Sequence, residues 1–191
     1  MPQAALASAR SVGINLQCDA ERIRNARAAF HWSFRKTVPP FTNEDWEADI
    51  TPNSIAGTLI DSSGTHAIHG VRSDGTSWDT AVSLLISPLP ESTFALVNNS
   101  SAMVRAGAEN VNGENTVKYA IDTSKAVPGE AGLIKNVLGA NGFIKGAAWV
   151  DAQGCPAKFV LDVEQNNNDG SVHREHYEAN VTRPEFLALH A

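Results

Sequence analysis

The sequence predicts an α+β protein built on a single large, curved antiparallel sheet, a half-barrel, with helices packed on its concave face. Apolar and polar residues alternate in many short segments with the period of a half-buried strand. Turn residues separate these segments at the spacing of hairpins, which gives about ten strands. One segment with helical character precedes the strands, and two further helical regions interrupt them. An open sheet of this size must curl, and helices on its hollow side would enclose an apolar space.

The clearest strands lie between residues 141 and 183. Gly142–Asp151, Pro156–Gln165 and Ser171–Arg183 form a predicted three-stranded antiparallel meander. The pair Asp169-Gly170 is a favoured hairpin turn, because glycine adopts positive φ readily and aspartate can bond its own backbone. The middle strand alternates between apolar and charged residues, so one face of this sheet is predicted to be wet and the other buried.

The N-terminal half predicts a second run of short strands. Phe30–Val38 alternates sharply, with Phe30, Trp32 and Phe34 on one face, and Pro39-Pro40 ends it. Trp46–Thr51 repeats the alternation. Three further strands are predicted, the last two joined through Ser73-Asp74-Gly75: Ser54–Asp61, Thr65–Arg72 and Thr76–Asp79.

Helices are predicted in three regions. Asp19–Ala29 has a capping aspartate and a weak apolar stripe. The apolar run Thr80–Ile86 and the stretch Glu91–Val97 predict two short helices, or a helix and a buried loop. Pro128–Leu138 has proline at its start and glycine after its end. Two strands, Ala102–Asn110 and Asn115–Thr123, precede this last helix and turn on Asn112-Gly113.

Length and composition indicate one soluble domain. The chain has 191 residues, 42% of them hydrophobic, and a formal net charge of −6. It is long enough for one large core, and we expect a flexible N-terminal segment over 1–18 and a single domain over 19–191. An acidic chain without a basic patch is a poor partner for nucleic acid, and it has the composition of neither a disordered nor an integral membrane protein.

Motifs for catalysis, metals or cofactors are weak. Two cysteines, Cys18 and Cys155, fit either a disulfide in an oxidising compartment or two unrelated thiols, and we expect neither to bind metal. Two histidine pairs have metal-like spacing, but residues i and i+3 of a strand point to opposite sides: His66 with His69, and His173 with His176. Asp162 and Glu164 share a strand face, where cross-strand charge pairs are more common than acid–base catalysts. We expect no metal, no cofactor and no catalysis.

Residues of the predicted turns and strands follow one another in a recognisable order in the second half of the chain: Val111-Asn112-Gly113, Tyr119, Asp122, Lys145-Gly146, Trp149 and Asp151. This order resembles the LolA-like superfamily of bacterial lipoprotein carriers, which includes mycobacterial lipoproteins of the LppX and LprG type. The resemblance covers roughly residues 19–183 and lies in the order of elements. It implies an unclosed half-barrel with helices as a lid over a cavity for acyl chains. A periplasmic or secreted location in the bacterial cell envelope follows, with a signal peptide presumed removed.

Aromatic residues are the best candidates for a binding surface. We expect an apolar cavity lined by Phe30, Trp32, Phe34, Trp46, Trp78 and Trp149, each of which has the alternative of a plain core position. The run Gly146-Ala147-Ala148 would leave room for a close helix or for a ligand. The sequence therefore predicts a non-catalytic binding or carrier protein for an apolar or amphiphilic ligand, such as a lipid or acyl chain. The alternatives are an interaction or sensor domain of the same fold with a filled core and, third, a small hydrolase or isomerase.

Overall fold

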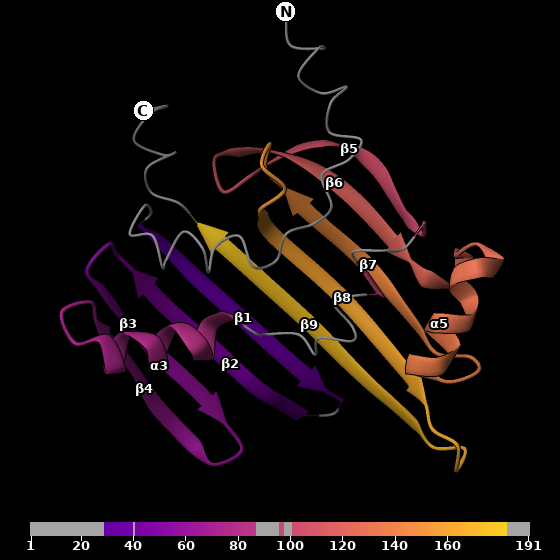
Figure 1. The fold of residues 1–191 in the computed structure, drawn as a ribbon, viewed down its shortest axis with the longest axis horizontal. Helices are drawn as coiled ribbons and strands as arrows, with labels where there is room; N and C mark the ends of the chain where they lie inside the picture. The colour runs from indigo at the N-terminus through magenta and orange to yellow at the C-terminus, as the bar shows by residue number, and fades with distance from the viewer. Residues whose placement is uncertain (1–28, 40, 87–95, 98–100, 183–191) are drawn as a thin grey trace, which may run out of the picture.

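Nine strands form one open antiparallel sheet in the computed structural model of the chain, which describes residues 29–39, 41–86, 96–97 and 101–182. The strand order is β4-β3-β2-β1-β9-β8-β7-β6-β5 (Figure 1). The strands are β1 (Phe30–Val38), β2 (Phe41–Ile50), β3 (Ser54–Asp61), β4 (Gly64–Val71), β5 (Met103–Val111), β6 (Glu114–Asp122), β7 (Phe143–Val150), β8 (Pro156–Asn166) and β9 (Val172–Thr182).

Two meanders make up this sheet. Strands β1 to β4 follow one another as hairpins. Strands β5 to β9 are also neighbours in chain order, but a helical segment connects β6 to β7. The pairing of β1 with β9 joins the two meanders, with Phe34 opposite Ala179. The meander predicted over the C-terminal residues is confirmed, as is the antiparallel order of the strands that precede it. The strands at the two ends, β4 and β5, do not pair with each other, so the sheet stays unclosed.

Helix α5 (Pro128–Leu138) is present with the predicted bounds. Proline stands in its first turn, and the Gly139 N–H donates to Lys135 O at 2.9 Å as the helix ends. A short 3₁₀ turn, η2 (Thr123–Lys125), links β6 to it, and the Asp122 carboxylate accepts from Ser124 N at 3.2 Å. Ile134 and Leu138 are the buried residues of α5, and four residues apart they lie on one helix face.

The prediction of a strand over Thr76–Asp79 is wrong. Those residues are the first turns of helix α3 (Gly75–Ile86). Asp74 O accepts from Trp78 N at 3.0 Å and from Ser77 Oγ at 3.1 Å, so Asp74 caps a helix where a hairpin turn was expected. An aspartate followed by glycine suits a hairpin turn and a helix start equally well. The helical spacing of three buried residues, Trp78, Ala81 and Val82, is what distinguishes the helix from the hairpin.

Both helices contribute to the same hydrophobic core as the sheet. Helix α3 packs against β4 and β3, as Figure 1 shows, and α5 packs against β8. One cluster of buried residues joins them to the strands. The helices therefore cover the apolar face of the sheet. The concave shape of that face, as in a half-barrel, stays a prediction.

Four expected features lie wholly or mostly outside the described residues. They are the flexible segment over 1–18, Cys18, the helix Asp19–Ala29, of which Ala29 alone is described, and the stretch Glu91–Val97, of which Leu96 and Val97 are described. Cys155 is disulfide-bonded and fully buried. In the described part of the chain, no helix has the length and apolar character needed to span a membrane.

Candidate functional site

Four of the six predicted site residues belong to the buried apolar face. Trp32 and Phe34 on β1 and Trp46 on β2 are exposed by 7%, 1% and 9%. Trp78 is also buried, but it lies on α3. The side chain of Phe30 lies outside the described parts of the chain, although its backbone pairs with Ile50.

Trp149 lies on the opposite face of the sheet. It stands directly across from Lys118 on β6 and Lys158 on β8, and residues that pair in this way share a face. Its neighbours along β7, Ala148 and Val150, are the buried ones. The six predicted residues are therefore not brought together into one site.

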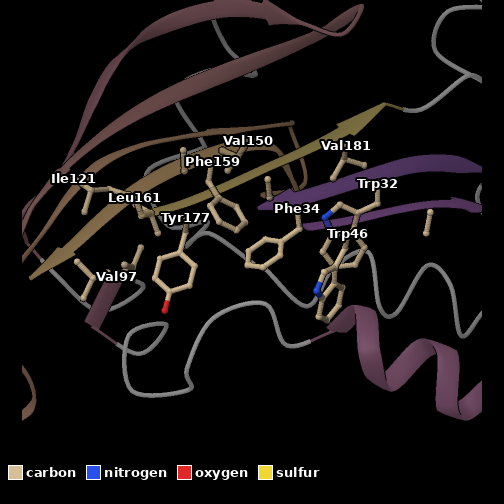
Figure 2. Packing of buried hydrophobic residues seen from close by; sticks show 14 of the residues in the cluster. Trp32, Phe34, Trp46, Val97, Ile121, Val150, Phe159, Leu161, Tyr177 and Val181 are labelled. Atoms are coloured by element: carbon tan, nitrogen blue, oxygen red, sulfur yellow. The ribbon is translucent and has the colours of Figure 1, made fainter. Parts of the chain in front are cut away.

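Strand register assembles the aromatic cluster, a name used here for Trp32, Phe34, Trp46 and Tyr177. Phe34 pairs with Trp46 on one side and stands next to β9 on the other. The Phe34 and Trp46 rings meet edge to face at 5.7 Å between centroids, and Phe34 lies 6.2 Å from Tyr177. Edge-to-face contacts suit the charge distribution of aromatic rings and add to the energy of burial. Figure 2 shows these rings side by side beneath the sheet, on its helix-bearing side.

Two indole nitrogens of this cluster are buried without a hydrogen-bond acceptor. Among the described residues, neither Trp32 Nε1 nor Trp46 Nε1 has a partner. Trp46 pairs with Phe34 and Trp32 pairs with Ala48, so the two tryptophans are diagonal neighbours on adjacent strands (Figure 2). A buried donor that lacks an acceptor costs about 1–3 kcal/mol. Such groups are rare in folded proteins and call for an explanation.

A charged group borders the aromatic cluster at its Tyr177 end. Lys36 Nζ lies 2.7 Å from Glu175 Oε1, and both side chains are largely buried. The Tyr177 hydroxyl donates to the other oxygen of Glu175. Burial raises the pKa of Glu175, but hydrogen bonds from Lys36 and Tyr177 outweigh it and hold that pKa below its ordinary value. Burial and the bond to Glu175 raise the pKa of Tyr177. The aromatic cluster is thus bordered on this side by an anchored ion pair.

Within the run Gly146-Ala147-Ala148, Gly146 has a role in strand pairing. A Cβ on Gly146 would stand 2.0 Å from Val160 O on the next strand, and the residue has φ +150°. The glycine is thus required by the close approach of β8, and a helix or ligand need not explain it. Ala148 is buried on the apolar face.

A polar pocket of about 530 Å³ lies on the face opposite the core. Its floor is formed by strands β1, β2, β7, β8 and β9, with side chains that include Ser33, Arg35, Asp45, Trp149, Glu178 and Asn180. Its roof is the β5–β6 hairpin, from Glu109 to Asn112. In Figure 2 this hairpin arches above the sheet on the side opposite the aromatic rings.

Three hydrogen bonds fix the roof to the floor. Glu109 Oε2 accepts from Trp149 Nε1 at 2.6 Å, across the intervening strand β6. Asn112 Nδ2 donates to Asn180 Oδ1 at 2.8 Å and to Val181 O at 3.0 Å, although β7 and β8 separate its hairpin from β9. A register shift between Arg105 and Gly107, with Gly107 at φ +146°, lets β5 bend toward the floor.

The charges around this pocket are paired. Arg35 binds Asp45 at 2.8 Å, and this hydrogen bond raises the arginine pKa. Lys158 lies 3.9 Å from Glu178. The Glu109 carboxylate binds Trp149 and also Lys118, at 3.2 Å, and the two bonds, in that order, lower its pKa.

The acid–base candidates form cross-strand pairs on the polar face. Asp162 Oδ1 lies 2.7 Å from His176 Nδ1, and Glu164 Oε2 lies 2.8 Å from Arg174 Nε. Each pair is formed by directly opposed residues of β8 and β9. Within the described residues, no group of three or more His, Cys, Asp or Glu side chains is arranged to hold a metal ion. Cross-strand pairing accounts for these residues, as the sequence analysis anticipated.

The polar pocket was missed by sequence reasoning. Asn112-Gly113 is predicted as a hairpin turn, and the structure confirms it, with both residues at positive φ. The contacts of that turn with β9 have no local signal, because they depend on how far the hairpin bends. Gly107, inside a strand pattern, is the one residue whose type indicates a bulge there.

Comparison with known proteins gives a weak likeness at the level of the fold. The chain aligns over 85% of its length with 57% of a chain in the complex structure of Pseudomonas aeruginosa MucA/MucB, at 14% sequence identity and a TM-score of 0.34. It therefore spans little more than half of that chain. No family model and no curated protein matches the sequence.

Proposed function

We propose that the protein is a non-catalytic binding protein of the bacterial cell envelope that holds an apolar or amphiphilic ligand, such as an acyl chain, against the aromatic cluster. The observation that carries the proposal is the pair of unpaired indole donors, Trp32 Nε1 and Trp46 Nε1. Their burial costs free energy unless an acceptor reaches them. A ligand with an apolar chain and a carbonyl or carboxylate oxygen supplies both the apolar contact and the acceptor.

The surroundings of the two indoles suit such a ligand. Phe34 and Tyr177 extend the aromatic surface beyond the tryptophans, and Trp78 of helix α3 belongs to the same hydrophobic core. Ligand sites are mostly apolar, with a few placed polar groups that fix orientation. The indole N–H groups of Trp32 and Trp46 would fix the orientation of the ligand here. The resemblance to lipoprotein carriers in the sequence points to the same class of ligand.

A location outside the cytoplasm is supported by Cys155. This residue is disulfide-bonded and fully buried. Disulfides persist in oxidising compartments such as the bacterial periplasm and are rare in the cytosol. The proposal of a periplasmic or secreted protein rests on this bond and on the resemblance described above.

The rival function is an interaction domain of the same fold whose interior is filled by side chains. Phe34, exposed by only 1%, and its edge-to-face contact with Trp46 favour this rival, since they are packed as in an ordinary core. The two functions differ in what the indole N–H groups do. In a filled core, replacing Trp32 by phenylalanine removes an unsatisfied donor and affects no ligand.

An affinity measurement with matched ligands tests the proposal. Methyl dodecanoate has an ester oxygen, and dodecane has a similar chain without any acceptor. Tryptophan fluorescence emission measures the binding, which should be saturable for the ester. We expect Trp32→Phe or Trp46→Phe to weaken the affinity for the ester about three- to tenfold, which corresponds to the loss of one net hydrogen bond. Dodecane binding should change less.

Trp149→Phe is the matched control, because Trp149 lies on the other face of the sheet. It should leave the affinity for methyl dodecanoate unchanged. Failure of the ester and of dodecane to bind the unsubstituted protein would remove the proposal and leave the filled-core interaction domain.

A further inference from the structure

The pocket on the polar face has the size and construction of a ligand site, separate from the aromatic cluster. Its volume of about 530 Å³ falls within the range of about 300–1,000 Å³ that small-molecule sites occupy. The sheet alone would leave this face flat and wet. The pocket exists because the β5–β6 hairpin bends over the sheet and is fastened there.

The fastening makes the pocket preformed. Asn112 binds Asn180 and Val181, and Glu109 binds Trp149, so two separate positions of the hairpin are attached to two different strands. Asn112 makes its contacts from a left-handed backbone conformation, φ 53°, that most side chains adopt only at a cost. None of these bonds adds to the apolar core. A site whose walls are held in place before binding loses less entropy when a ligand enters.

The charge pattern of the pocket selects against charged ligands. The carboxylates of Asp45, Glu109 and Glu178 each have a cationic partner, from Arg35, Lys118 and Lys158 respectively. A charged ligand would have to displace one member of an ion pair. A hydroxyl group can instead donate to the remaining lone pairs of a paired carboxylate, or accept from the free N–H positions of an arginine.

Neutral hydrogen-bonding groups and an aromatic side chain complete the lining. Ser33, Asn110 and Asn180 offer a hydroxyl and amides, which both donate and accept. Trp149 is half-buried, and its ring is held by the bond from Nε1 to Glu109. Lys118 Nζ and Lys158 Nζ lie 4.7 Å and 5.5 Å from the centroid of that ring. An indole beside mixed donors and acceptors matches a sugar ring, which has hydroxyls at its rim and C–H groups on its faces, and a sugar that contacts the indole face takes the place of a lysine side chain there.

We propose that this roofed pocket binds an uncharged saccharide. Asp45, Glu178 and the asparagine amides bind its hydroxyls, and Trp149 contacts its C–H groups. The site is independent of the aromatic cluster, and a ligand can occupy either face alone.

The indole N–H signals of the four tryptophans provide a direct test by NMR. Maltotriose, cellobiose and N,N′-diacetylchitobiose are titrated as neutral probes, and glucose 6-phosphate and glucosamine as charged ones. The Trp149 signal is assigned as the one that disappears in Trp149→Phe. We expect at least one neutral probe to shift this signal and to reach saturation below about 10 mM, while the signals of Trp32 and Trp46 do not shift. The charged probes should bind at least tenfold more weakly.

Two variants locate the binding. Asn112→Gly keeps the turn but releases the roof from β9, and Trp149→Leu removes the aromatic contact. Each should weaken saccharide binding tenfold or more, measured by isothermal titration calorimetry because Trp149→Leu lacks the Trp149 signal. Lys145→Ala is the control, since Lys145 contacts Phe143 on β7 and is not part of the pocket lining. The proposal is overturned if no neutral probe shifts the Trp149 signal, if the charged probes bind as tightly, or if the two variants bind as the unsubstituted protein does.

Discussion

Asn112 donates its side-chain amide to Asn180 at 2.8 Å and to Val181 O at 3.0 Å, and so ties the β5–β6 hairpin to a strand from which two other strands separate it. The hairpin is thereby bent over the polar face. Without this contact the sheet would be open and its polar face would have no pocket covered by the hairpin.

The first prediction concerns the stability that this clamp supplies. Asn112→Gly keeps a residue suited to φ 53° but removes both bonds, at a cost of roughly 1–3 kcal/mol in the free energy of unfolding. Asn112→Ala should cost more, because alanine also bears the left-handed strain. Urea unfolding measures both. If Asn112→Gly were as stable as the unsubstituted protein, the clamp would contribute nothing.

The second prediction concerns pH. Because the pKa of Glu175 is lower in the folded protein than its ordinary value of 4.5, its ionised form stabilises the fold above that pH. The stabilisation is lost as the pH falls through the folded-state pKa. Glu175→Gln should cost about 1–3 kcal/mol at pH 7, and the difference from the unsubstituted protein should shrink on acidification.

Glu47→Gln is the control for this pH effect, since Glu47 is mostly exposed on the other face. It should change the stability by less than about 0.5 kcal/mol at pH 7. Denaturant unfolding at several pH values gives both comparisons. A Glu175→Gln deficit that persisted undiminished at low pH would mean that lost packing, and not the ion pair, is responsible.

The third prediction separates two glycines. Gly146→Ala places a Cβ 2.0 Å from Val160 O at a backbone φ of +150°, so it should destabilise the protein by at least about 2 kcal/mol. Gly132→Ala, in the middle of α5 with open space around it, should stabilise by about 0.5–1 kcal/mol. Thermal unfolding of the two variants should move in opposite directions. Equal effects would contradict the close approach of β7 and β8.

The fourth prediction concerns the thiols. Cys155 is disulfide-bonded and the chain has two cysteines, so we expect no free thiol. The protein denatured without reductant should therefore not react with a thiol reagent. After reduction it should take up two equivalents. Mass spectrometry of the alkylated protein makes the count. A reactive thiol before reduction would contradict the bond and weaken the case for an oxidising compartment.

Much of the sheet could be predicted because alternation and turn chemistry are local. The period of Phe30–Val38 and the helix bounds at Pro128 and Leu138 appear in the sequence and in the structure alike. The failure at Thr76–Asp79 is also local, since Asp74-Gly75 suits a helix cap as well as a turn.

The candidate sites were less predictable, because they depend on relations between distant strands. Alternation placed Trp32 and Phe34 on one face, and the pairing with β2 brought Trp46 beside them. It did not tell which face of β7 would carry Trp149, since that depends on register with β6 and β8. Nor did it indicate that the two indole nitrogens lack acceptors, which is a property of the whole cluster.

The NMR signals of the Trp32 and Trp46 indole N–H groups test the central claim most directly. When methyl dodecanoate is added, at least one of them should move saturably downfield, as expected for a donor that gains an acceptor, and dodecane should not cause that downfield shift. Both signals unchanged at saturating ester, or the same shift with dodecane, would contradict the binding of an acceptor-bearing acyl ligand at the aromatic cluster.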